Sequence, residues 1–511
     1  MRAWGMRLRC AALVCAALVL STGIIGALLR QAQRALVEDR GPSAHERMRI
    51  QMERARVHAP NAATHSGLHE QHILTRGRSA LSELGPGEEF LLTTEQLAQV
   101  LAVSVDNTND PHELELLKIA RRLPNQKTQT KQHPLSIVKT NTVPAFVMVL
   151  QARGDHEGFL LQHMRGAGQH AFHADKHEPI GAVLERDLAE CASDRLGASS
   201  PSVPPLVIDA GAYFGFFGFQ AAAAGCDAVL IEPQRALAPF LAASALLNGA
   251  EFAKRVQILR ALISGPTLPS TTWPEHFHLV DRHGMSSYAV PVEVSAVNPP
   301  TTDTFTLDGL LHLADRQSRF KRPLHKAQTD GGVPLPRVVA LKLDVQGLEV
   351  AALQGVKQLA LAHGQVQNIL VEFGPPAHWL RAATGVTQPD VSKVSPRQRG
   401  STQDHTHSAA IVGDPAVVAS LLDEACHTLR EFVGGNATAG STYELRWLAD
   451  TPGWRPVVAQ EFALGRESTA TPAGAPIEYV VIPRPSIEPV MRRLMSGRRS
   501  MAVHLWLSLN E

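Results

Sequence analysis

Residues 207–233 read "VIDAGAYFGFFGFQAAAAGCDAVLIEP" and contain two apolar runs that each end in an acidic residue. The first run ends at Asp209 and is followed by Gly211 and Gly215, and the second run ends at Glu232. A glycine turn brings backbone N–H groups and the N-terminus of a helix close to a ligand. A carboxylate after the next strand accepts hydrogen bonds from the hydroxyls of a ribose. The stretch therefore predicts a βαβ unit that binds a nucleoside-containing cofactor, and a βαβ turn without a ligand is the alternative.

The spacing of the glycines helps to distinguish two cofactors that contain a nucleoside, a dinucleotide such as NAD and S-adenosylmethionine. A dinucleotide site has the pattern G-x-G-x-x-G, in which the second glycine admits the pyrophosphate. Here Gly211, Gly215 and Gly218 are spaced differently, and Tyr213 occupies the place of that second glycine. A bulky side chain at this place disfavours NAD, whereas S-adenosylmethionine has no phosphate to accommodate. We therefore expect S-adenosylmethionine as the cofactor.

The rest of the chain continues the alternation of strands and helices. A first apolar run of strand length is "AFVMVLQA", and from about residue 200 further runs follow at regular intervals, among them "VQILRALIS", "VVALKLDV" and "NILVEFG". An insertion at 266–336 and a polar loop at 386–411 interrupt the pattern. An amphipathic helix at 415–435 and closing strands at 442–450 and 501–510 complete it. This order predicts an α/β fold, with a parallel sheet that carries helices on both faces.

Two further motifs lie in the second half of the chain. "VVALKLDVQGLEVAALQGV" contains Lys342, Asp344 and Glu349, and "NILVEFGPP" contains Glu372. With the loop from Asp209 to Gly215 and with Glu232-Pro233, they resemble the FkbM-type family of S-adenosylmethionine-dependent O-methyltransferases. That family shows D-x-G-A-N-x-G, E-P, K-x-D-V-[EQ]-G-x-E and V-E in this order. The resemblance covers about residues 175–511 and implies a Rossmann-like class I methyltransferase sheet.

The resemblance also implies roles for individual residues. Asp209, Gly211, Ala212 and Gly215 would surround the methionine part of the cofactor, Glu232 would bind the ribose, and Ala261 and Leu262 would lie against the adenine. Asp344 would orient the acceptor or act as the base, with Lys342 and Glu349 beside it. Simpler interpretations are that Asp344 and Glu349 cap the following helix and that Glu372 is a buried partner of Lys342. The family usually has Asn where this chain has Tyr213, so a non-catalytic binding domain stays open. Glu178 is a weaker candidate for contact with the cofactor.

The N-terminal segment predicts attachment to a membrane. An uncharged run of 20 residues, 10–29, follows a short basic tail at 1–9, and about 30 Å of helix spans a bilayer core. We interpret this run as a signal anchor, with a cleaved signal as the alternative. Residues 30–140 are predicted to be a stem of low compaction with short helices, and 141–511 to be the methyltransferase domain. We expect a single-pass protein with a lumenal C-terminal domain in the secretory pathway, such as the Golgi.

The charge balance and the cysteine and histidine content bear on whether the chain binds nucleic acid or a metal ion. With 49 basic and 48 acidic residues, the chain shows no charge excess that would favour nucleic acid. Outside the apolar run, Cys191, Cys226 and Cys426 are widely spaced and predict neither a disulfide framework nor a zinc site. His170, His173 and His177 would share a helical face, but 23 histidines make chance clusters common, so no metal is expected. The expected partner is a hydroxyl-bearing glycan or small molecule. A membrane-anchored glycosyltransferase is the second hypothesis, although the chain has no Asp-x-Asp triplet.

Overall fold

The computed structural model describes residues 81–151, 179–196, 204–265, 277–280, 288–291, 304–307, 337–383, 415–434, 441–448, 460–495 and 503–510, with short gaps inside some of these ranges. All of them belong to the second of two units of the chain, Glu70–Glu511. The predicted anchor at 10–29 lies outside the described residues. Among the residues that are described, no helix has the length and the apolar character needed to cross a membrane.

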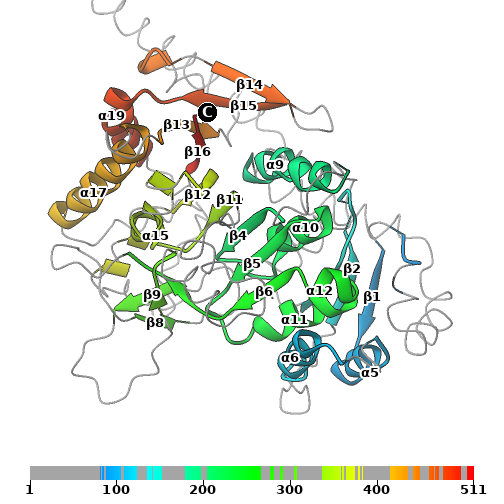
Figure 1. The fold of residues 1–511 in the computed structure, drawn as a ribbon. Helices are drawn as coiled ribbons and strands as arrows, with labels where there is room; N and C mark the ends of the chain where they lie inside the picture. Colours follow the sequence, from blue (N-terminus) through cyan, green and yellow to red (C-terminus); the bar gives the residue numbers. More distant parts are fainter. Residues whose placement is uncertain are drawn as a thin grey trace, which may run out of the picture. The chain divides into compact units, whose positions relative to one another are not determined.

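Nine strands form one large sheet, which confirms the mixed α/β fold. Their bounds are β4 Leu206–Ala210, β5 Asp227–Ile231, β6 Val256–Leu259, β11 Val338–Leu343, β12 Val366–Phe373, β13 Tyr443–Leu448, β14 Arg466–Ala470, β15 Pro476–Val481 and β16 Val503–Leu509. Their order across the sheet is β14-β15-β13-β16-β12-β11-β4-β5-β6 (Figure 1). Strands β4, β5, β6, β11 and β12 pair in parallel, whereas β16 is antiparallel to β12 and β13, and β15 is antiparallel to β13 and β14. Only β15 and β16 therefore run against the direction of the other strands in this sheet.

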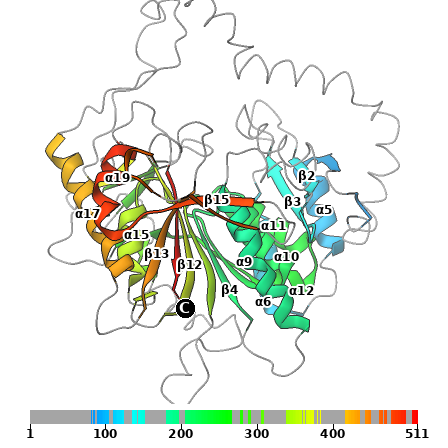
Figure 2. The same cartoon turned by 90° about the horizontal axis from the view of Figure 1, so that it is seen from above.

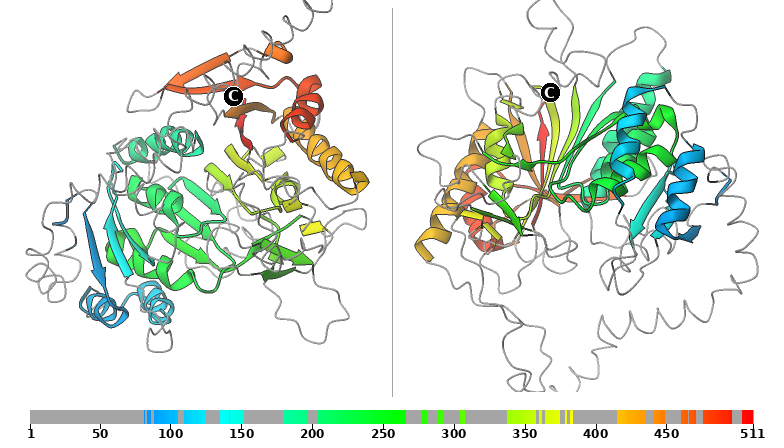
Figure 3. Two further views of the ribbon diagram at one scale, coloured as in Figure 1. Left: turned by 180° about the vertical axis from the view of Figure 1, so that it is seen from behind. Right: turned by 90° about the horizontal axis from the view of Figure 1, so that it is seen from below.

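Helices cover both faces of the sheet, as the apolar runs predict. Every residue of β4 and of β11 is buried, which is the pattern of strands that are covered on both sides. On one face lie α9 (Pro179–Leu196), α10 (Phe216–Ala224) and α11 (Ala238–Leu247), and on the other lie α15 (Glu349–Gly355), α17 (Pro415–Gly434) and α19 (Ile487–Met495) (Figures 2 and 3). Two separate apolar cores result, one between the sheet and each group of helices.

A smaller layer precedes the sheet in sequence and packs against α11. It contains β1 (Glu89–Leu92), β2 (Leu135–Lys139), β3 (Val147–Gln151), α5 (Thr94–Ser104) and α6 (Pro111–Ala120). The backbone N–H of Val147 donates to Oδ1 of Asn248 and that of Val149 to Oγ of Ser244, at 2.7 and 2.8 Å. These two hydrogen bonds join residues that are 101 and 95 positions apart in the sequence. In the described part of the predicted stem, α5 and α6 contact α11, and Nε2 of His112 lies 3.0 Å from the carbonyl oxygen of Ala253, so this part is folded onto the sheet domain.

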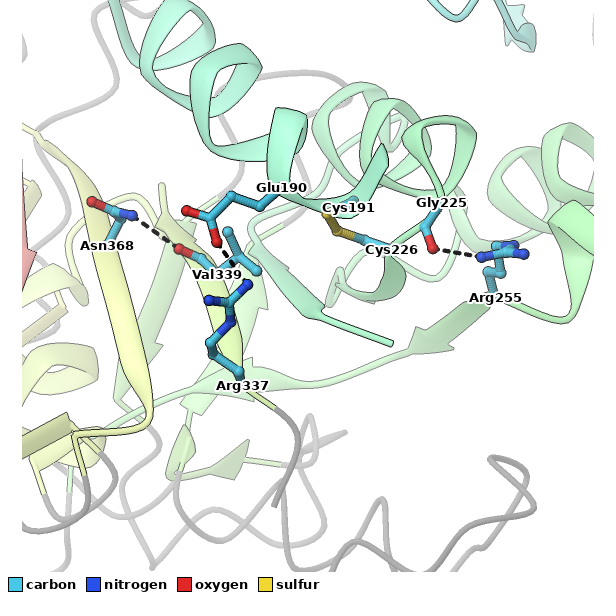
Figure 4. The surroundings of a disulfide bond; sticks show 8 residues. All are labelled: Glu190, Cys191, Gly225, Cys226, Arg255, Arg337, Val339 and Asn368. Atoms are coloured by element: carbon cyan, nitrogen blue, oxygen red, sulfur yellow. Dashed lines mark hydrogen bonds and ion pairs between the residues drawn. A yellow bond between two sulfur atoms is a disulfide. The ribbon is translucent and has the colours of Figure 1, made fainter. Parts of the chain in front are cut away.

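A disulfide bond corrects the expectation that the cysteines are unpaired. Cys191 on α9 and Cys226, just before β5, are 35 residues apart in sequence but have Cα atoms 5.2 Å apart (Figure 4). Cys226 comes shortly after α10, and α10 packs against α9, so tertiary packing brings the two cysteines together, which sequence spacing does not report. An ion pair of Arg337 with Glu190, at 2.6 Å, also holds α9 to the sheet. Cys426 is buried and carries a free thiol.

Several described elements were not predicted. They are β1, β2, α9, α12 (Ala250–Ala253), β14, β15, α19 and the 3-10 turn η5 (Arg484–Ser486). The predicted insertion at 266–336 contains the hairpin of β8 (Phe277–Val280) with β9 (Tyr288–Pro291), and β10 (Thr304–Phe305), which pairs with β7 (Leu262–Ile263). The polar loop at 386–411 lies outside the described residues.

Candidate functional site

The candidate residues gather where the order of the strands changes direction. From β4 the chain continues outward through β5 and β6, and after the insertion it returns beside β4 as β11 and continues the other way through β12. In open α/β sheets, ligands bind outside the carboxyl ends of the strands at such a switch point. Asp209 lies near the end of β4, and Asp344 directly follows β11, so both predicted residues lie at this point.

The glycine loop after β4 lies between the ends of β5 and β11, the two strands that flank β4. The N–H groups of Gly211 and Ala212 donate to the carbonyl of Ile231 in β5, at 2.9 and 3.1 Å, and the N–H of Asp344 donates to the carbonyl of Ala210 at 3.0 Å. Gly211 has φ +77°, and a Cβ added there would lie 1.7 Å from the carbonyl oxygen of Asp344. No side chain fits between the loop and β11, so this position requires glycine.

Glu232 ties the same loop to the end of β5. Its Oε2 accepts the N–H of Tyr213 and its Oε1 accepts the N–H of Gln234, both at 2.8 Å. The side chain is buried, and this burial raises the pKa of Glu232 to about 7, although the two backbone hydrogen bonds act to lower it. A carboxylate has about four acceptor positions, so two hydrogen bonds leave capacity for the hydroxyls of a ligand.

The backbone conformation of Tyr213 is one that Asn, the residue at this position of the FkbM-type motif, adopts readily. The φ of Tyr213 is +53°, in the left-handed region, where Asn is several-fold enriched among non-glycine residues. The ring of Tyr213 makes an edge contact with Phe214, with centroids 4.5 Å apart, and packs against the core on the α10 side of the sheet. The aromatic ring of this chain therefore has a packing role in the loop.

Lys342 links β11 to the residues of the glycine loop. Its Nζ donates to the carbonyl of Gly211 at 3.1 Å, and it lies 3.4 Å from Oδ1 of Asp209 and 3.7 Å from Oδ2 of Asp344. The other oxygen of Asp209, Oδ2, accepts the N–H of Gly218 in the first turn of α10 at 3.0 Å. Lys342 is buried, so one ammonium group sets the positions of two carboxylates and a loop carbonyl.

Asp344 belongs to a group of titratable residues that spans three strands. Oδ1 of Asp344 accepts from Nε2 of Gln346 at 2.6 Å, and Oε2 of Glu372, on β12, lies 3.4 Å from Nε2 of His504, on β16. Burial and the neighbouring charge of Glu372 raise the pKa of Asp344 to about 6. Burial also raises the pKa of Glu372, but the hydrogen bond and charge of His504 outweigh it and hold this pKa below its ordinary value.

Glu349 has a structural role. Its Oε1 accepts the N–H of Gly347 at 2.8 Å and its Oε2 accepts Nε1 of Trp379 at 2.9 Å. The side chain is fully buried, and burial raises its pKa to about 8. Glu349 thus secures the turn before α15, but the prediction that it caps this helix is wrong, because among the described residues no side-chain hydrogen bond caps α15. For Glu372 the structure favours His504 as the direct partner, and Lys342 acts on it only through its charge.

The remaining predicted residues lie farther along the rim of the sheet or outside the described part. The N–H of Glu232 donates to the carbonyl of Leu259 at 3.0 Å, so the end of β6 lies beside Glu232. Ala261 and Leu262 follow it, and both side chains are buried. Glu178, His170, His173 and His177 lie outside the described residues. Within the described part of the chain, no group of three or more His, Cys, Asp or Glu side chains is placed to hold a metal ion.

Of the titratable residues Asp344, Glu372 and His504, His504 is the one that the sequence motifs do not include. It is the only ionisable residue in the apolar run "VHLWLSL", and a lone histidine inside a buried strand is the one signal that marks it. Comparisons with protein-family models, curated proteins and solved structures gave no match to this chain. The resemblance to the FkbM-type family therefore rests on the motifs and stays a prediction.

Proposed function

We propose that the chain is an S-adenosylmethionine-dependent methyltransferase of the class I fold that methylates a hydroxyl group. One observation carries the proposal: three of the four motifs, namely the glycine loop, the motif with Glu232 and the motif with Lys342 and Asp344, converge at the switch point of the sheet. The loop at 209–215 contacts Glu232 through Tyr213, Lys342 through the carbonyl of Gly211, and the backbone of Asp344. The resemblance predicts this convergence from the order of the motifs alone.

The residues around the loop fit the predicted cofactor. Gly211 lets the backbone pass close to β11, and the acceptor capacity that remains on Glu232 suits ribose hydroxyls. Asp209, Gly211, Ala212 and Gly215 are assigned to the methionine part, Glu232 to the ribose, and Ala261 and Leu262 to the adenine. When bound, the cofactor supplies a methyl group on a positively charged sulfur. The chain's contribution is to hold an acceptor oxygen in line with that methyl group and to receive its proton.

Within this proposal, Asp344 and Lys342 have different roles in methyl transfer. Asp344 is partly exposed and its pKa is raised toward neutrality, which is the range in which a general base is effective. Lys342 is buried and contacts Asp209, Asp344 and the glycine loop. We therefore assign proton acceptance to Asp344, and we assign to Lys342 the positioning of Asp344 and of the loop.

The proposed location is the lumenal side of a secretory membrane, with the chain anchored through residues 10–29. The disulfide between Cys191 and Cys226 supports this proposal, because disulfides persist in oxidising compartments and are rare in the cytosol. A lumenal site would meet glycans and other hydroxyl-bearing acceptors, which agrees with a partly exposed carboxylate as base.

Calorimetric titration of the full chain with S-adenosylhomocysteine tests the proposal. We expect micromolar binding that Glu232→Ala abolishes, because the substitution removes the ribose acceptor and releases the loop at Tyr213. Glu251→Ala is the matched control, since Glu251 is an exposed glutamate that pairs with Lys254 on the surface. A folded full chain that does not bind S-adenosylhomocysteine would contradict the proposal and favour a non-catalytic relative.

A further inference from the structure

Asp344, Glu372 and His504 form a row across three neighbouring strands. In the parallel register of β11 with β12, Leu343 pairs with Val371, so the next residues, Asp344 and Glu372, follow side by side. In the antiparallel register of β12 with β16, Glu372 pairs directly with His504. Side chains directly opposite each other on neighbouring strands point to the same face and have Cβ atoms about 5 Å apart. The row lies at the carboxyl end of the parallel strands.

Each carboxylate of the row has its own cationic neighbour. Nε2 of His504 lies 3.4 Å from Oε2 of Glu372, and Nζ of Lys342 lies 3.7 Å from Oδ2 of Asp344. Lys342 is shared with Asp209, which it approaches to 3.4 Å, so Asp344 receives only part of its charge. The Glu372 and Asp344 side chains are 30% and 23% exposed, whereas that of His504 is 8% exposed. The two carboxylates are therefore accessible from outside, whereas the imidazole is buried.

We infer that His504 is a positioning residue of the methyl-transfer site: it holds Glu372 as an ionised carboxylate, so that the neighbouring Asp344 is the group that accepts the proton of the acceptor. The inference rests on the proposed function. In the step, the acceptor oxygen forms a bond to the methyl carbon while the carbon–sulfur bond breaks and its electron pair stays on sulfur. The hydroxyl proton passes to Asp344, and the cofactor leaves as a neutral thioether.

The charges that surround the row agree with this division of roles. Glu372 raises the pKa of Asp344, whereas Lys342, Gln346 and His504 lower it. The pKa of Glu372 is lowered by His504, by Lys342 and by His378.

Further charges at the site belong to Asp209, whose Oδ1 lies 3.4 Å from Lys342, and to Glu349, whose pKa Asp344 raises. Two adjacent carboxylates do not ionise at the same pH. His504 decides that Glu372 is the one that ionises first.

The test uses the charge difference between two ligands of the full chain. S-adenosylmethionine carries a positive sulfur and S-adenosylhomocysteine a neutral one, and both place the same ribose at Glu232. The ratio of their dissociation constants, measured by calorimetry from pH 5 to 8, therefore cancels the titration of Glu232. As Asp344 ionises near pH 6, the preference for the charged ligand should rise on the order of tenfold.

Three variants move this transition in different ways. His504→Gln removes a charge that lowers the pKa of both Asp344 and Glu372, so the later of the two ionisations, and with it the midpoint, should move up. Glu372→Gln removes the charge that raises the pKa of Asp344, so the midpoint should move down. Asp344→Asn should remove the rise in preference for S-adenosylmethionine with pH. A purely structural loss would not move the first two midpoints in opposite directions.

The control is His427→Gln, because His427 forms a similar pair with Glu431, at 3.8 Å, on the surface of α17. Its midpoint should equal that of the wild type. Midpoints of His504→Gln and Glu372→Gln that stay unchanged, or that move in the same direction, would overturn the inference while both ligands still bind. Failure of both ligands to bind the folded wild type would instead overturn the proposed function.

Discussion

Gly211→Ala is expected to weaken cofactor binding about 100-fold through one steric conflict. The backbone of Gly211 has φ +77°, and an added Cβ would lie 1.7 Å from the carbonyl oxygen of Asp344. Real Cβ atoms essentially never approach closer than 3.0 Å, so loop and strand must separate by at least 1.3 Å (3.0 − 1.7). The carbonyl belongs to a backbone that is hydrogen-bonded to Ala210 at 3.0 Å. The substitution therefore displaces the glycine loop and the end of β11 relative to each other.

The size of the effect follows from this displacement. The 2.8 Å hydrogen bond from the N–H of Tyr213 to Glu232 would lengthen beyond bonding distance if the loop moved directly away from it by that amount. A misplacement of about 1 Å in a ligand site costs about 100-fold, which corresponds to about 2.7 kcal/mol of binding free energy. Calorimetry with S-adenosylhomocysteine should show this loss in affinity.

Gly249→Ala is the matched control, because Gly249 also has a positive φ, +99°, but nothing lies within 4 Å of an added Cβ. Both variants should lose about 1–3 kcal/mol of unfolding free energy from backbone strain, and only Gly211→Ala should lose affinity for the ligand. If Gly211→Ala binds S-adenosylhomocysteine within about threefold of the wild type, the close approach of loop and strand does not shape the site.

Three further predictions concern stability and protons. Replacing Cys191 and Cys226 together by Ala should lower the unfolding free energy by about 3–4 kcal/mol, the loop-closure value for 35 residues, and in urea unfolding a reductant should then destabilise only the wild type. Because ribose hydroxyls favour an ionised Glu232, whose pKa is about 7 without ligand, binding at pH 6.5 should release protons. Calorimetry in two buffers of different ionisation enthalpy measures this release, and Glu232→Gln should remove it. The raised pKa of Glu349, about 8, means that its contribution to stability is complete below its ordinary value and is lost as pH rises through 8; the cost of Glu349→Gln in urea unfolding should shrink accordingly between pH 6 and pH 9.

Elements with a strong local pattern were predicted correctly. The runs that became β4, β5, β11 and β12 are mostly apolar and lie near glycine or proline, and a run of this kind is typical of strands that are buried on both faces. The positions of Asp209, Glu232 and Asp344 at strand ends followed from the same pattern. Helix α19 was missed although Ile487, Val490, Met491 and Leu494 have helical spacing, since the helix is short and follows a proline-rich stretch.

The sequence by itself determined the fold class and the strand ends on which a site can be built, because these depend on periodicity and on residues close together in the chain. Only the tertiary structure decided which residues meet. The pairing of Cys191 with Cys226, the packing of 81–151 on α11, and the placement of His504 beside Glu372 all join segments far apart in sequence. Such contacts depend on strand order and register, which no local pattern encodes. For the same reason Lys342 proved to be buried between Asp209 and Asp344, where its charge positions the site.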